Sequence, residues 1–126
     1  MSPEDYEIWQ RWFPAHRQEI KRLWFDVGLG LPDQIPETED ANQLLGWIRN
    51  TQKRADVIAE TEKEILLIEL RFNAQLNAIG RLSGYVLLIK DDNPFTKPIR
   101  PMLITNKQDS EVERLGKALG IEYRVA

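Results

Sequence analysis

Two short apolar runs joined by a charged turn constrain the fold of this chain more than any other feature. Residues 55–59 and 65–70 are rich in β-branched side chains and too short for independent helices, whereas residues 60–64 carry three glutamates and a lysine. The pattern predicts an antiparallel hairpin with its turn centred between Glu62 and Lys63. In that register the numbers of opposed residues sum to 125, so Asp56 faces Glu69.

This register places two acids side by side on one face of the sheet. Opposed residues of an antiparallel pair have Cβ atoms about 4.5 to 5.5 Å apart, so two carboxylates there repel each other unless positive charge lies between them. A divalent metal ion would supply that charge. By the same parity, however, Arg54 and Arg71 fall on the same face, each diagonal to one acid. The four side chains would then form a self-neutralised salt-bridge ladder that needs no metal, and the pattern leaves both interpretations open.

The segments before the hairpin predict helices and one strand. Ser2 is a good N-cap for a helix that runs to Pro14 with Tyr6, Trp9 and Phe13 on its buried stripe, and the helix resumes over residues 15–21. Alternating apolar residues predict a strand over 23–27. An irregular acidic loop over 28–40 and a short helix over 41–48 follow.

The segments after the hairpin complete an α/β pattern. Asn73 is expected to cap a helix that ends at residues 91–94, and a strand follows over 100–105. Ser110 and Glu113 form a capping box for a helix that ends at Gly120, before a last strand over 121–125. The expected fold is a single α/β domain over residues 1–126, with a central mixed sheet of about five strands flanked by helices.

Composition narrows the chemistry that this chain can perform. It contains no cysteine and one histidine, His16, so thiolate zinc sites and histidine metal clusters are excluded and any metal must be bound by oxygen. The formal net charge is −3, which is not typical of a strongly basic nucleic-acid binder. The sequence shows neither a signal peptide nor an apolar run long enough to span a membrane, so we expect a soluble, cytoplasmic protein that does not bind membranes.

Three runs, at residues 54–58, 65–71 and 80–85, together resemble the core of the PD-(D/E)XK nuclease-like superfamily, whose fold is that of restriction endonucleases. The resemblance covers about residues 54–125. It implies that Asp56 and Glu69 are the metal carboxylates, with Mg²⁺ or Mn²⁺ as the cofactor and DNA as the substrate. It also implies a third acid on the first helix, for which Glu7 and Glu19 are candidates that the sequence does not separate.

Two arginines depart from the family pattern. Arg71 stands where the family has a catalytic lysine, and Arg81 where many members have glutamine. Arginine binds phosphate bidentately, but its pKa above about 12 prevents it from accepting a proton as a buried lysine can. We therefore expect Arg71 to hold or neutralise the scissile phosphate, and Arg54 and Arg81 to contact phosphate or the DNA backbone. Three lysines could replace the missing one, and no spacing selects among Lys53, Lys63 and Lys90.

Two functional hypotheses follow. The first is metal-dependent DNA phosphodiester hydrolysis through Asp56 and Glu69, impaired to some degree by Arg71. The alternative is a nuclease-like fold without catalysis that acts as a structural or interaction protein in a phage or mobile-element assembly, and is then virion-associated. A protein partner or a second copy would bind the tryptophan-rich first half, where Trp12 lies off the apolar stripe and is the best interface candidate. The four tryptophans are Trp9, Trp12, Trp24 and Trp47.

Overall fold

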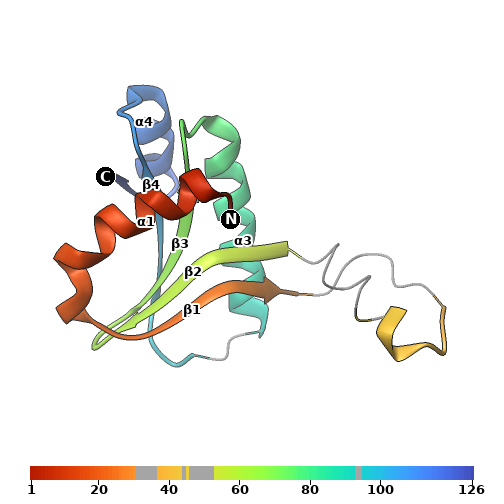
Figure 1. The fold of residues 1–126 in the computed structure, drawn as a ribbon. Coiled ribbons are helices and arrows are strands. Elements are labelled where there is room, and N and C mark those ends of the chain that lie inside the picture. Colours follow the sequence, from red (N-terminus) through yellow and green to blue (C-terminus); the bar gives the residue numbers. More distant parts are fainter. Residues whose placement is uncertain (31–36, 44, 46–52, 93–94) are drawn as a thin grey trace.

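A mixed sheet of five strands, in the spatial order β1-β2-β3-β4-β5, forms the centre of the molecule (Figure 1). The computed structural model describes residues 1–30, 37–43, 45, 53–92 and 95–126. Strands β1 to β3 pair antiparallel, and β3 to β5 pair parallel. The strands are β1 (Ile20–Leu29), β2 (Lys53–Thr61), β3 (Ile65–Arg71), β4 (Ile99–Thr105) and β5 (Glu122–Val125). The predicted fold class, an α/β domain with about five strands, is confirmed.

The register of the predicted hairpin is confirmed. Val57 pairs with Ile68 and Ile58 with Leu67, so the numbers of opposed residues sum to 125 as expected. The turn is held by Thr61, whose hydroxyl group accepts from the Glu64 backbone N–H at 3.1 Å. Because the side-chain period of a strand is two, this register places Asp56 and Glu69 on the same face of the sheet.

Helices cover both faces of the sheet (Figure 1). α1 (Pro3–His16) packs on one face against a cluster that includes Val57, Ile68 and Ile104. α3 (Leu76–Asp92) and α4 (Ser110–Ala118) cover the other face. No helix within the described residues combines the length and the apolarity that crossing a membrane requires.

The orientation of α1 differs from the predicted one. The helix begins with a capping box in which the Ser2 hydroxyl accepts from the Asp5 backbone N–H at 3.1 Å. Its buried face consists of Asp5, Ile8, Trp9 and Trp12, while Tyr6 is 45% exposed. Trp12 is only 6% exposed and is part of the core, so its prediction as an interface residue was wrong. The sheet selects this face because Ile8, Trp9 and Trp12 together fill the space over β2, β3 and β4.

Several predicted helix ends were also wrong. α1 continues past Pro14 to His16, and the short 3₁₀ helix η1 (Arg17–Glu19) leads directly into β1 where the helix was expected to resume. Asn73 does not cap α3: its φ of 49° and the bond from its N–H to the side chain of Asn106 make it a loop residue.

The N-cap of α4 is Asp109 rather than Ser110, because its carboxylate accepts from the backbone N–H groups of Glu111 and Val112. Residues 41–43 and 45 are helical, as predicted. The remainder of the helix predicted over 41–48, including Trp47, lies outside the described residues.

Strand β1 has an unusual backbone conformation at Asp26. Asp26 has a φ of 50°, in the left-handed region that side chains other than glycine, asparagine and aspartate seldom adopt. Leu23 packs with the α1-side cluster, whereas Val27, four residues later, packs with the α3-side cluster. In a regular strand Leu23 and Val27 would point to the same face of the sheet. Because they point to opposite faces, the side-chain alternation of β1 is interrupted at Asp26.

Candidate functional site

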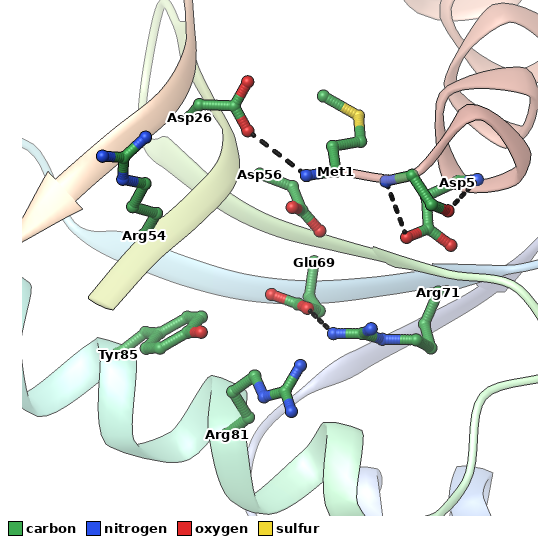
Figure 2. Close-up of a pocket in the computed structure, with 10 residues that line it drawn as sticks. Met1, Asp5, Asp26, Arg54, Asp56, Glu69, Arg71, Arg81 and Tyr85 are labelled. Carbon is green, nitrogen blue, oxygen red and sulfur yellow. Dashed lines mark hydrogen bonds and ion pairs between the residues drawn. The ribbon is translucent and has the colours of Figure 1, made fainter. Parts of the chain in front are cut away.

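A charged cavity of about 440 Å³ opens between the start of α1, strands β1 to β3 and α3 (Figure 2). Four carboxyl groups and three guanidinium groups line it, together with a tyrosine and the first two residues of the chain. The lining residues are Met1, Ser2, Asp5, Asp26, Arg54, Asp56, Glu69, Arg71, Arg81 and Tyr85. The structure therefore brings all five sequence-predicted site residues, from β2, β3 and α3, into one cavity.

Both central carboxylates of this cavity are buried. Asp56 is 9% exposed and Glu69 only 2%. One oxygen of Asp56 accepts from the Leu70 backbone N–H at 2.9 Å, which fixes the Asp56 side chain against the neighbouring strand. One oxygen of Glu69 accepts from the Arg71 guanidinium at 2.7 Å, a contact along β3 rather than across the hairpin. The salt-bridge ladder predicted from the sequence pairs each arginine diagonally across the hairpin, so this contact within β3 is not one of its pairs.

Burial of this pair makes ionisation of both acids unfavourable. The pKa of Glu69 is raised to about 7. Desolvation by burial is the largest cause, the neighbouring Asp56 carboxylate also raises the pKa, and Arg71 lowers it. The pKa of Asp56 is also raised, chiefly by desolvation, while the hydrogen bond from Leu70 lowers it. The negative charge of the pair is thus incompletely compensated by the surrounding side chains.

The raised pKa of Glu69 predicts that stability falls between acid and neutral pH. The unfolded chain releases this proton near the ordinary value of 4.5, whereas the folded protein holds it until about pH 7. Between these values the folded state binds more protons, so the free energy of unfolding decreases as pH rises and levels off above about pH 7. Urea denaturation in EDTA at pH 5 and pH 8 should show a larger loss for the wild type than for Glu69→Gln. Equal losses in the two proteins would contradict the raised pKa.

The three arginines reach the cavity from different elements, and in Figure 2 the Arg71 and Arg81 side chains point toward Glu69 whereas Arg54 points away from both acids. Arg71 follows Glu69 on β3 by two residues, Arg54 lies near the start of β2, and Arg81 is on α3 (Figure 2). The Tyr85 side chain lies one helical turn after Arg81 and is 8% exposed. Among the described residues no lysine lines the cavity, so none of Lys53, Lys63 and Lys90 replaces the lysine of the family pattern.

The acid that the first helix contributes is Asp5, which sequence reasoning missed. Asp5 is 5% exposed, and its carboxylate accepts from the Phe72 backbone N–H at 2.8 Å, directly after the end of β3. Glu7 and Glu19, the two acids considered from the sequence, are exposed and do not line the cavity. The local pattern that involves Asp5 is the capping box with Ser2, in which an acid at the third helical position bonds back to the N-cap residue. This pattern places Asp5 at the start of the helix and does not by itself predict that Asp5 lines a cavity.

Asp26 is the second acid that the sequence did not indicate. Its carboxylate lies 3.6 Å from the amino group of Met1 and faces the cavity from β1 (Figure 2). No local pattern predicts this placement, because it depends on the left-handed backbone conformation of Asp26 within β1.

The donor set limits the kind of metal ion that could bind here. Within the described ranges, no group of three or more histidine, aspartate or glutamate side chains is arranged to hold a metal ion. Of the four carboxyl groups that line the cavity, those of Asp56 and Glu69 come from the two strands of the hairpin. Mg²⁺ is commonly held by one or two carboxylates with water and substrate phosphate completing its shell. The residues present therefore fit a magnesium site completed by water and phosphate, and they do not fit a site made by protein ligands alone.

The fold and cavity define this chain as an α/β domain with a mixed sheet and a charged site at the hairpin. No protein-family model matches the chain, and no curated protein matches it with significance. Among solved structures it is similar to the crystal structure of a protein of unknown function, AF1548, with a TM-score of 0.59 and 15% sequence identity. The match covers 94% of this chain and 56% of that one, so this chain spans little more than half the length of that neighbour. At this identity the similarity shows the fold alone.

Proposed function

We propose that the charged cavity hydrolyses phosphodiester bonds of DNA with Mg²⁺ or Mn²⁺, in a domain of the PD-(D/E)XK nuclease-like kind. One observation carries the proposal. The hairpin register brings Asp56 and Glu69 together, and the cavity that they share is also lined by three arginines. Paired carboxylates suit a hard divalent cation, and guanidinium groups suit the phosphate that such a cation would activate. The sequence resemblance to the superfamily points to the same two acids.

Electrostatics supports a cation between the two acids. The pKa values of both Asp56 and Glu69 are raised, so bringing both to the ionised form costs free energy in the protein alone. A bound Mg²⁺ would favour the ionised forms, polarise the phosphate and lower the pKa of a bound water. Asp56 is fixed by Leu70, so it would serve as a positioned ligand, whereas Glu69 would share its carboxylate between the cation and Arg71.

The arginines would bind the substrate rather than activate water. Arg71 is held beside Glu69 at 2.7 Å, and Arg81 reaches the same cavity from α3 (Figure 2). Both can donate two parallel hydrogen bonds to a phosphate and offset charge that develops on it. Neither can accept a proton near neutral pH, so removal of the proton from the attacking water falls to bulk water or to a substrate phosphate oxygen.

The direct test is conversion of supercoiled plasmid to nicked circles by purified protein. We expect nicking with Mg²⁺ or Mn²⁺ and none with EDTA, because the acids hold no catalytic water without a cation. Asp56→Ala purified in the same way should not nick, which controls for contaminating nucleases, whereas His16→Ala, a change outside the cavity, should nick at the wild-type rate. Absence of nicking with both metals would contradict the proposal.

The ion pair between Arg71 and Glu69 favours a second candidate function. The Arg71 guanidinium occupies an oxygen of Glu69. Arg71 also stands where the family has the lysine that activates water. In this alternative the domain keeps the nuclease-like fold without catalysis and serves as an interaction protein, as in a phage or mobile-element assembly. The two functions differ in what a lysine at position 71 would do.

Replacing Arg71 by lysine is expected to increase the plasmid-nicking rate about tenfold at pH 8 if the domain is an impaired nuclease. General acid–base catalysis typically contributes at least about a hundredfold, and part of this gain would be lost with the bidentate phosphate contact of arginine. The measurement is the initial nicking rate of Arg71→Lys against wild type, with Arg114→Lys on exposed α4 surface as the matched control. A protein inactive in both forms would favour the interaction function.

A further inference from the structure

An apolar groove of about 450 Å³ adjoins the charged cavity. Three residues line both spaces, Met1, Ser2 and Asp26, so the groove and the cavity are neighbours. The rest of the groove is formed by Pro3 and two aromatic side chains. We name it the aromatic groove, lined by Met1, Ser2, Pro3, Tyr6, Phe25 and Asp26.

The two aromatic rings of the groove are exposed to solvent. Tyr6 on α1 and Phe25 on β1 are each 45% exposed. The Phe25 ring meets the buried Trp9 ring edge to face, with centroids 5.8 Å apart and an interplanar angle of 86°. Trp9 in turn stacks on Phe13 at 5.1 Å, so Phe25 is supported from the core side while nearly half of its surface stays in water. The Phe25 ring is thus held by packing, and the exposed surface of both rings can contact a planar ligand.

We propose that the aromatic groove binds an unpaired nucleobase of a single-stranded nucleic acid whose adjoining phosphate lies in the charged cavity. This inference rests on the proposed function and names its substrate class. Arg54, Arg71 and Arg81 offer positive charge to a phosphate, and the groove next to them offers aromatic faces to the base attached to that phosphate. Bases inside a duplex stack on each other, so only an unpaired base can present its face to Tyr6 or Phe25.

Binding to a normal and an abasic strand isolates the contribution of the base. The probes are a fluorescein-labelled ten-nucleotide oligo(dT) and an abasic strand of equal length and charge, measured by fluorescence anisotropy with Ca²⁺ as the metal. Stacking of one base on aromatic side chains is worth about 1 to 3 kcal/mol, so wild-type protein should bind oligo(dT) about tenfold more tightly than the abasic strand.

Leucine substitutions test the two rings while keeping apolar bulk. Tyr6→Leu and Phe25→Leu should each weaken binding of oligo(dT) about fivefold and leave binding of the abasic strand unchanged. Tyr6→Phe, which keeps the ring, should behave as wild type. Leu87→Ala, a change at a 67% exposed apolar residue of α3, is the matched control and should change neither affinity.

Three results would overturn the subsite. The first is equal affinity of the wild type for the two strands, and the second is duplex DNA bound as tightly as the single strand. The third is a dimer in sedimentation equilibrium that either leucine variant dissociates, because a second copy would then occupy the groove. Plasmid nicking without base-dependent binding overturns the subsite alone. Base-dependent binding with cleavage of neither plasmid nor oligo(dT) in Mg²⁺ or Mn²⁺ overturns hydrolysis and supports the subsite.

Discussion

Replacing Asp56 by alanine is expected to abolish calorimetric Mg²⁺ binding and to slow plasmid nicking by at least about a thousandfold. Asp56 is one of the two hairpin carboxylates in the cavity, and its oxygen is positioned by the Leu70 backbone N–H at 2.9 Å. Loss of a metal ligand removes the charge stabilisation that the cation gives to the transition state, worth several kcal/mol, and each 1.4 kcal/mol corresponds to about tenfold in rate.

The asparagine variant separates loss of the metal site from loss of the fold. Asp56→Asn keeps an oxygen that can accept from Leu70 and removes a charge whose ionisation is unfavourable there, since the pKa of Asp56 is raised. We expect Asp56→Asn to lose metal binding and nicking while its free energy of unfolding in EDTA at pH 8 equals or exceeds that of the wild type. Asp91→Asn, at an exposed position of α3, is the matched control. Full nicking activity in Asp56→Ala would contradict the assignment of Asp56 to the site.

Replacing Asp5 by alanine is expected to lower the free energy of unfolding by about 3 kcal/mol. The Asp5 carboxylate accepts from Phe72 at 2.8 Å and closes the capping box with Ser2, so alanine leaves a backbone donor near the end of β3 without its partner. A hydrogen bond to a charged group contributes about 1.5 to 3 kcal/mol, and loss of an N-cap interaction about 1 kcal/mol. The measurement is urea denaturation followed by tryptophan fluorescence.

Asp109 provides the comparison for Asp5, because it is an exposed carboxylate that only caps a helix. Asp109→Ala removes the cap of α4 and should cost about 1 kcal/mol. Asp5→Asn keeps an acceptor oxygen for Phe72 and should fall between wild type and Asp5→Ala. Equal losses for Asp5→Ala and Asp109→Ala would show that the tie from Asp5 to Phe72 contributes nothing to stability.

The sequence predicted the centre of the site because the signal there is local. A charged turn of five residues between two apolar runs determines the hairpin register, and the register alone places Asp56 beside Glu69. Arg54 and Arg71 follow from the same parity. Arg81 could be added only through the family resemblance, since it lies on a helix whose position over the sheet no strand pattern determines.

The remaining parts of the site depend on tertiary packing. The α1 stripe was predicted around Tyr6 and Phe13, but the sheet buries the face that carries Trp12 and Asp5. A helical period tells which residues share a face, whereas the choice between two adjacent apolar faces depends on the shape of the surface they meet. The same limit applies to α3, where Leu87 is 67% exposed and Tyr85 is buried. The position of Asp26 in the cavity depends on a backbone conformation that no sequence pattern predicts.

The change of facing at Asp26 has a consequence for how the molecule unfolds. Leu23 belongs to the hydrophobic cluster beneath α1 and Val27 to the cluster beneath α3, although both lie on the edge strand β1. Peeling β1 from the sheet therefore exposes apolar surface in both layers at once, and neither layer can melt while the other stays intact. We expect this coupling to give one cooperative transition, in which far-ultraviolet circular dichroism and tryptophan fluorescence report the same midpoint.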